Sequence, residues 1–125
     1  MSSQAKVAED YLHYLENGEV SKVIGLFSAE GMVQSPLYGL MPAKEFYTAL
    51  AADTTASKLT AKGIFEKTEG KELALYFTYQ WTLKSGEEVS FDVVDILEFD
   101  TRGAIKKLTI IYDTVQARVL KEALT

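Results

Sequence analysis

The chain has 125 residues, of which 47% are apolar and 25% are charged, so it is long enough for one domain with a hydrophobic core and its composition argues against disorder. Its 18 acidic and 13 basic residues give a net charge of -5, which argues against a nucleic-acid partner, because binding a polyanion depends on clustered Lys and Arg. Without cysteine, a disulfide framework, a thiolate metal site and a cysteine nucleophile are excluded. No apolar run approaches the roughly 20 residues of a membrane span, and no apolar signal core opens the chain. We therefore expect a soluble, cytoplasmic protein that does not act on a membrane.

Apolar residues at helical spacing mark the first part of the chain. A first helix is predicted to end at Asn17 and Gly18, because glycine tolerates the left-handed conformation that often follows a helix. A second helix follows almost at once, and its pattern includes Phe27 and ends at Gly31. The residues that set these two patterns are Val7, Tyr11, Leu12, Leu15, Val20, Val23, Ile24 and Phe27.

Two prolines set the next boundaries. Pro36 is predicted to end a short strand of residues 32–35, and residues 37–41 are predicted to be a connector. Pro42 fits the first turn of a third helix, where its missing N–H costs nothing. Residues 53–57 are small and polar, which predicts a loop.

From Lys58 onward the period of the apolar residues changes from 3.6 to 2, which predicts four long strands joined by tight turns. Tight turns make neighbouring strands antiparallel. The remaining residues 116–124 fit either a short helix or a frayed tail. Helices on one face of such a sheet give an α+β fold, here in a single domain of residues 1–125 whose sheet curves around the helices.

Asp95 breaks the pattern of the third long strand. The other residues on its face are Val89, Phe91, Val93, Leu97 and Phe99. An ionised carboxylate in apolar surroundings is costly, so Asp95 requires a raised pKa, a specific donor or a water-filled cavity. Such violations tend to mark functional sites. A structural partner, or a bulge that turns the side chain outward, is the alternative, and the pattern favours neither.

Two stretches of the sequence carry a family resemblance. Residues 11–19 run on to 24–27, and residues 91–100 are followed by Gly103 and 108–113. Together they resemble SnoaL-like proteins of the nuclear-transport-factor-2-like superfamily, which includes ketosteroid isomerase, limonene epoxide hydrolase and polyketide cyclases. The resemblance implies a cone, with three N-terminal helices packed in a strongly curved mixed sheet and a pocket between them. It is informative about the fold and weak about the reaction, since this fold hosts many functions.

The resemblance also implies roles for particular residues. Ketosteroid isomerase holds a developing oxyanion with a helix tyrosine and a protonated aspartic acid, and by position Tyr11 and Asp95 resemble these two. Its general base precedes a proline on the first strand, where this chain has Ser35 before Pro36. Serine alone does not abstract a proton at neutral pH, which puts the isomerase reaction in doubt. The resemblance further implies a small hydrophobic ligand, no cofactor, and a homodimer formed through the outer sheet face, on which lie Tyr76, Thr78, Gln80 and Thr82.

Other candidate residues have competing interpretations. His13, the one histidine, lies about 200° around the helix from Tyr11 and is predicted to face solvent. Asp113 could be a second inward acid or a strand-end residue bonded to backbone. A group of aromatic residues could line a hydrophobic pocket, or could be ordinary core or dimer contacts: Tyr38, Tyr47, Phe77, Tyr79, Trp81 and Phe91. No metal cluster, phosphate-binding glycine loop or Ser-His-Asp set can be assembled.

Two functions of different classes follow. The chain could be a cofactor-free isomerase, cyclase or hydrolase that stabilises negative charge with Tyr11 and Asp95. It could instead be a non-catalytic ligand-binding or dimerisation module, which Ser35 favours. We expect a SnoaL-like protein with a hydrophobic pocket for a small molecule, and the sequence leaves catalysis open.

Overall fold

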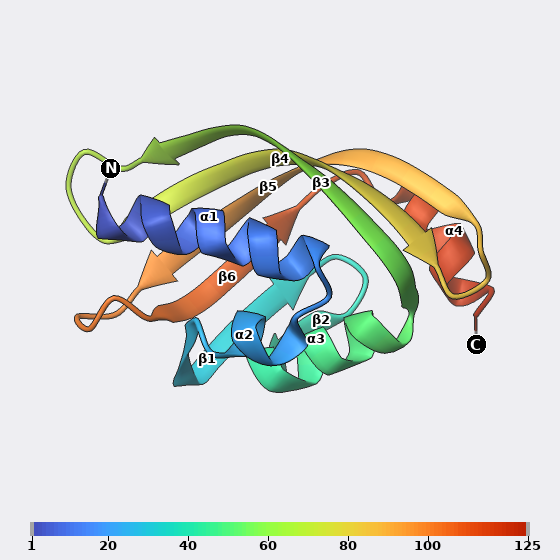
Figure 1. Cartoon of the computed structure of the whole chain (residues 1–125), viewed down its shortest axis with the longest axis horizontal. Coiled ribbons are helices and arrows are strands. Elements are labelled where there is room, and N and C mark those ends of the chain that lie inside the picture. The colour runs from blue at the N-terminus through green and yellow to red at the C-terminus, as the bar shows by residue number, and fades with distance from the viewer. Residues whose placement is uncertain (1, 125) are drawn as a thin grey trace.

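The structure is a computed structural model that describes residues 2–124 (Figure 1). Two helices, two strands and a third helix form the first part of the chain, and four strands and a last helix follow. The elements are α1 (Ser3–Glu16), α2 (Val20–Ile24), β1 (Phe27–Ser35), β2 (Gly39–Pro42), α3 (Ala43–Ala52), β3 (Thr54–Glu66), β4 (Glu72–Leu83), β5 (Glu88–Phe99), β6 (Ile105–Ile111) and α4 (Val115–Glu122).

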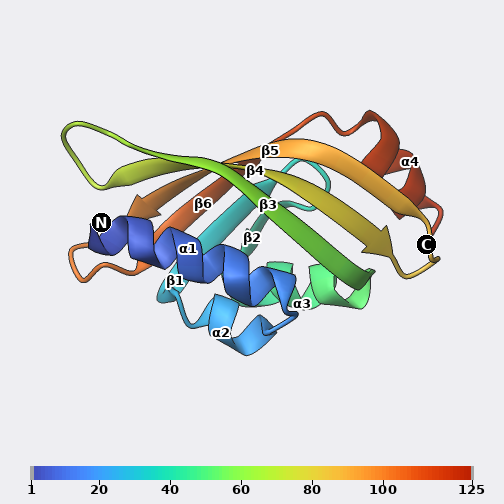
Figure 2. The ribbon, with the colours of Figure 1, turned by 45° about the horizontal axis from the view of Figure 1, so that its top comes forward.

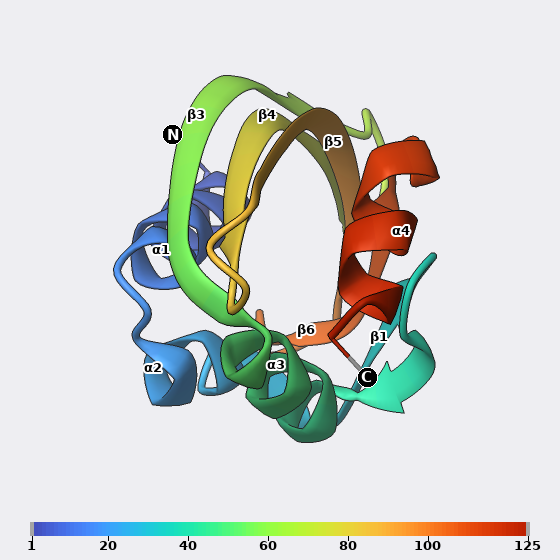
Figure 3. The ribbon, with the colours of Figure 1, turned by 90° about the vertical axis from the view of Figure 1, so that its right-hand side faces the viewer.

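The six strands form one mixed sheet in the order β2-β1-β6-β5-β4-β3. Neighbouring strands are antiparallel except for β1 and β6, which are parallel. The sheet curves strongly, and Figure 3 shows β3, β4 and β5 arching over one end of the molecule. Helices α1, α2 and α3 lie together on one side of this arch, and Figure 2 shows α1 running beneath β3 and β4. The α+β cone with three N-terminal helices, expected from the sequence, is confirmed.

The strict alternation in β4 builds much of the core. Every second residue of this strand is buried on the concave face, and those between are partly exposed: the buried ones are Leu73, Leu75, Phe77, Tyr79, Trp81 and Leu83. Helix α1 supplies the opposite wall through Ala8, Tyr11 and Leu12, which are 8% exposed or less. A Ser2 hydroxyl that accepts a hydrogen bond from the Ala5 N–H, at 3.0 Å, caps this helix at its start.

Helix α2 is shorter than its apolar spacing predicts. It ends at Ile24, and Phe27 begins β1 because this strand pairs with β6, where Phe27 lies beside Ile105. The register of the two strands shifts between Phe27 and Met32. Gly31 lies in this shift, and a Cβ there would come within 2.9 Å of the Phe27 Cβ. The predicted helix end at Gly31 was therefore wrong, because pairing between distant segments overrides local helical spacing.

Two predicted loop segments are strands. The connector 37–41 contains the start of β2, which forms a hairpin with β1, and the predicted loop 53–57 is largely the start of β3. A bulge between Ala61 and Gly63 then shifts the alternation of β3. As a result Ile64 packs against the core and Phe65 is 61% exposed. Strict alternation from Leu59, which also packs against the core, would have placed Phe65 inward and Ile64 outward.

Residues 115–122 form helix α4, so of the two C-terminal alternatives the helix is correct. It lies on the opposite side of the arch from α1 (Figure 3). The Arg118 guanidinium donates a hydrogen bond to the Pro36 carbonyl at 2.8 Å, and the Lys121 ammonium lies 4.8 Å from the centre of the Tyr38 ring. Among residues 2–124, no helix is long and apolar enough to cross a membrane.

Candidate functional site

A small, mostly aromatic cavity lies inside the cone, between α1, α3 and the concave face of the sheet. We call it the inner cavity, and its volume is about 40 Å³. Most of the candidate residues named from the sequence line it, and Tyr47 and Asp113 do not. The full lining is Tyr11, Leu15, Ser35, Tyr38, Phe46, Leu50, Phe77, Tyr79, Trp81, Phe91, Val93, Asp95, Ile110 and Tyr112.

Asp95 is the one buried carboxyl group among the described residues, with 1% of its surface exposed. Its neighbours across the sheet are Leu75 in β4 and Ile110 in β6. Its Oδ1 atom has no hydrogen-bond partner within residues 2–124. Burial raises the pKa of this carboxyl well above its usual range, because the charged form loses its hydration. Burial therefore favours the protonated form of Asp95, which can donate a hydrogen bond.

Tyr11 comes from the buried face of α1, and its hydroxyl lies 2.7 Å from the hydroxyl of Tyr47 in α3. Both side chains are 2% exposed or less. Burial is the main cause that raises the pKa of Tyr11 well above its usual value, followed by Tyr47 and Asp95. A phenol in this environment stays protonated. One of the paired hydroxyls can donate to the other, which leaves a proton for an acceptor in the site.

Ser35 ends β1 and is 7% exposed. Its hydroxyl oxygen accepts a hydrogen bond from the Tyr38 N–H at 3.0 Å, which closes the turn between β1 and β2. Tyr38 in turn donates its hydroxyl proton to Asp53, at 2.6 Å. Ser35 thus stabilises a turn as well as lining the cavity. Among the described residues, no side chain that could act as a base lies within hydrogen-bond distance of its hydroxyl.

Aromatic rings form the wall of the inner cavity on the sheet side. Phe91 and Tyr112 stack with their centres 4.4 Å apart, and Phe91 also lies 5.7 Å from the Tyr79 ring. Burial raises the pKa of Tyr79 to about 12, and its hydroxyl is 2.8 Å from the hydroxyl of Ser57. The Trp81 indole N–H donates to the Thr54 hydroxyl at 2.8 Å. These bonds hold the polar ends of the rings and leave their apolar faces toward the cavity.

The size of the inner cavity limits what it accepts as it stands. A water needs a space of about 10–15 Å³, whereas pockets for drug-sized ligands are about 300–1,000 Å³. At about 40 Å³, the inner cavity has room for very few atoms. A larger ligand must displace aromatic side chains or extend beyond the cavity.

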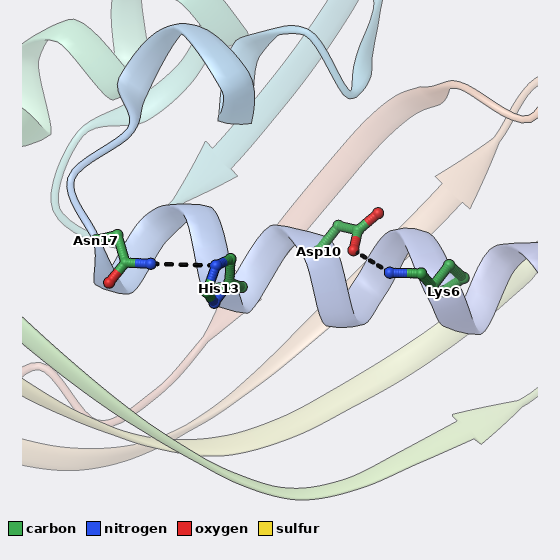
Figure 4. Close-up of polar contacts among 4 residues, drawn as sticks. All are labelled: Lys6, Asp10, His13 and Asn17. Atoms are coloured by element: carbon green, nitrogen blue, oxygen red, sulfur yellow. Dashed lines mark hydrogen bonds and ion pairs between the residues drawn. The ribbon is translucent and has the colours of Figure 1, made fainter.

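Two sequence candidates lie away from the inner cavity. Asp113 is exposed, and its carboxylate accepts a hydrogen bond from the Val115 N–H at 3.0 Å, so it is the strand-end residue of the two alternatives and not an inward acid. Leu108, Ile110 and Tyr112 occupy the inward positions of that segment, so Asp113 does not reach the inner cavity as a ligand-binding residue would. His13 is exposed and lies 3.3 Å from Asn17 on the polar face of α1, which also carries the ion pair of Lys6 and Asp10 (Figure 4).

The sequence reasoning missed several residues that contribute to the site. Tyr112 and Ile110 could have been found, because they alternate with the buried Leu108 along β6 and its extension. Tyr47 was considered only as a possible pocket wall, and its bond to Tyr11 depends on how α1 and α3 pack, which has no local signal. Among residues 2–124, no three His, Asp or Glu side chains gather closely enough to hold a metal ion.

Comparison with known proteins gives a clear result for the fold. No sequence-family model matches the chain, and no curated protein matches it. Solved structures do match. A nuclear-transport-factor-2-like protein of unknown function from Burkholderia pseudomallei has a TM-score of 0.82 at 14% identity, with 96% of this chain and 98% of that chain covered.

Two further matches are proteins whose descriptions mention small molecules. TerC, co-crystallised with polyporic acid, has a TM-score of 0.81 at 17% identity, over 97% of this chain and 99% of its own. SalBIII, an epoxide hydrolase/cyclase-like enzyme with a role in pyran ring formation in the polyether salinomycin, has a TM-score of 0.77 at 12% identity, over 88% and 90%. The chain therefore has the nuclear-transport-factor-2-like fold, as its resemblance predicted. At these identities the likeness concerns the fold alone.

Proposed function

We propose that this protein binds a small, largely apolar molecule that carries a carbonyl or phenolic oxygen, and that the oxygen lies at Asp95 and Tyr11. The observation that carries this proposal is the unpartnered Oδ1 of Asp95, a residue that is 1% exposed and lines an aromatic cavity. A buried polar atom without a partner costs about 1–3 kcal/mol, which a ligand oxygen would recover by completing the hydrogen bond. Two proteins of the same fold support the class of ligand: SalBIII, with its role in pyran ring formation, and TerC, which was co-crystallised with polyporic acid.

We further propose that the unmodified chain binds this ligand without isomerising it. By the resemblance, Ser35 stands where ketosteroid isomerase has its base, and its hydroxyl accepts a hydrogen bond from the Tyr38 N–H. A serine without an adjacent base does not take a proton from carbon at neutral pH. The two proposed donors to an oxyanion are Tyr11 and Asp95. Among the described residues that line the inner cavity, there is no further carboxylate and no histidine that could act as the base that generates the oxyanion.

Titration of the protein with 4-methylphenol, followed by NMR, tests the binding site. Saturable binding is expected, with resonances of the inner cavity shifted, and Asp95→Leu should weaken it about tenfold, the equivalent of one hydrogen bond lost to a buried acid. Asp92→Leu is the matched control, because Asp92 lies on the exposed face of the same strand. Binding that is absent, or equally strong in Asp95→Leu, would contradict the proposal and leave the inner cavity as filled core.

A homodimer formed through the outer face of the sheet is part of the same proposal. The half-exposed row of Tyr76, Thr78, Gln80 and Thr82 on β4 supports it, because a partly polar face with aromatic content suits a protein interface. Sedimentation at micromolar concentration should give twice the chain mass, and a monomer would remove this part of the proposal alone. The cytoplasmic setting expected from the sequence stays a prediction.

A further inference from the structure

A second and larger pocket lies just outside the inner cavity, where the end of α1, helix α2, helix α3 and the start of β3 meet. We call it the outer pocket, and its volume is about 370 Å³, within the range of small-molecule sites. Its polar lining residues are Glu16, Asn17, Glu19, Thr54, Thr55 and Ser57. None of the sequence patterns predicted it, because it is made from the ends of four elements.

The outer pocket and the inner cavity share one wall. Leu15 of α1, Leu50 of α3 and Tyr79 of β4 line both spaces. The hydroxyl of Tyr79 lies 2.8 Å from that of Ser57, which belongs to the outer pocket, while its ring borders the inner cavity. Rotation of these three side chains would join a polar compartment to the apolar one that contains Asp95.

The charges around the outer pocket favour one kind of polar group. Glu16 and Glu19 contribute carboxylates, and of the described residues that line it none is Lys, Arg or His. The Lys22 ammonium lies 3.1 Å from Glu19, and Glu16 uses one oxygen to accept the Leu59 N–H at 2.8 Å. The second oxygen of Glu16 remains able to accept a hydrogen bond from a ligand. This excess of acceptors and negative charge disfavours an anion and favours a cation or a neutral donor.

We infer that the outer pocket is the second compartment of the ligand site, and that it holds the cationic amine end of a ligand whose phenolic or carbonyl end lies at Asp95. The inference rests on the proposed function for the inner end and adds the chemistry of the outer end. It also resolves the size problem, since the inner cavity alone is too small for a drug-sized ligand and the outer pocket supplies the missing volume. Tyr79, Leu15 and Leu50 then surround the middle of the ligand.

Four phenols separate the contributions of the two compartments. 4-Methylphenol carries only the phenol end, whose ring must displace side chains of the inner cavity, and 4-butylphenol adds an apolar tail. 4-(4-Aminobutyl)phenol and 5-(4-hydroxyphenyl)pentanoate carry a tail that ends in a cation or an anion. The amine should bind about fivefold more tightly than the carboxylate, as expected for a charge contact near a protein surface, and the double variant Glu16→Gln/Glu19→Gln should remove this preference. Glutamine keeps the acceptor that Glu16 offers to Leu59.

A variant that fills the outer pocket tests its location. Ala51 in α3 lines the pocket, and Ala51→Phe should weaken the aminobutyl compound about tenfold while leaving 4-methylphenol unaffected. Ala52→Phe is the control, since Ala52 is exposed on the same helix and is not among the lining residues. This inference would be overturned if 4-methylphenol binds but Ala51→Phe does not weaken binding of the aminobutyl compound, or if the carboxylate compound binds more tightly than the amine. Either result would leave the proposed function standing. Absence of 4-methylphenol binding would remove the proposed function itself.

Discussion

Asp95 in β5 lies directly opposite Leu75 in β4, so a carboxyl group takes a place in a stripe of apolar side chains. Both residues are 1% exposed or less. Burial raises the pKa of Asp95, since the charged form loses its hydration and no cation offsets this loss in the described part of the chain. The apolar surroundings therefore favour the neutral acid over the charged carboxylate.

The first prediction is that Asp95→Asn is neutral or stabilising at pH 7. The folded-state pKa of Asp95 lies above its unfolded value, so the penalty is absent below the unfolded pKa and grows as pH rises toward the folded pKa, by at most about 1.4 kcal/mol per pH unit. The free energy of unfolding of the variant, relative to the unmodified protein, should therefore be higher at pH 7 than at pH 4. Urea unfolding at the two pH values measures it, with Asp113→Asn as the exposed control.

Carbon-13 NMR of the Asp95 carboxyl checks the cause of this pH dependence directly. Its pKa should lie above the ordinary value of about 4. A titration at or below that value, together with a destabilised Asp95→Asn at pH 7, would show that the carboxylate is charged and satisfied in the folded protein.

The second prediction concerns the pair of tyrosine hydroxyls. Tyr11→Phe should destabilise the protein by about 1–2 kcal/mol, because it leaves the buried Tyr47 hydroxyl without its partner at 2.7 Å. Tyr47→Phe should cost a similar amount for the same reason. The double variant should cost less than the sum of the two, with a coupling of about 1 kcal/mol in the free energy of unfolding. Additive losses would mean that the two hydroxyls do not depend on one another.

The third prediction is that Ser35→Asp introduces weak isomerase activity. An aspartate oxygen can still accept the Tyr38 N–H and close the turn, while its second oxygen can take a proton from carbon. With cyclohex-3-en-1-one as a small test ketone, conversion to the conjugated ketone should rise about a hundredfold over the unmodified protein, the lower end of the range for a positioned base. Ultraviolet absorbance follows the product.

Ser35→Asn is the matched control for this gain of activity, since it offers the same turn acceptor and no base. Isomerisation by the unmodified protein would contradict the assignment of Ser35 and indicate a base elsewhere. A folded Ser35→Asp variant that binds 4-methylphenol and shows no turnover would mean that the carboxylate does not reach the substrate carbon.

The fourth prediction concerns Gly31 at the irregular junction of β1 and β6. A Cβ at this position would lie 2.9 Å from the Phe27 Cβ and 3.1 Å from the Ile105 carbonyl oxygen. Since neither atom belongs to the end of a flexible side chain, Gly31→Ala should destabilise the protein by about 1–3 kcal/mol. Denaturant unfolding measures the loss, and unchanged stability would mean that the junction relaxes freely.

The sequence predicted the parts of this fold that depend on local periodicity. The alternation of β4 and β5, the first helix and the segregation of helices from strands all follow from residue spacing, and the outlier Asp95 was recognisable for the same reason. Phe27 was placed wrongly in a helix, and Phe65 departs from the alternation of its strand, because strand pairing and a bulge decide their positions. The volume of the inner cavity and the existence of the outer pocket depend on how side chains from separate elements fill space, which spacing along the chain does not encode.

The parallel contact of β1 with β6 has a consequence for how the chain reaches its native state. Val33 pairs with Leu108, so this contact joins segments that lie far apart in the sequence. Contacts between such distant segments pay a large loop-closure entropy before they stabilise anything, and they slow folding. The hairpins of β3 to β6 can form first, and until β1 arrives, β6 presents an open edge that could pair with another chain. During refolding this open edge is therefore the part of the sheet most exposed to pairing with another molecule.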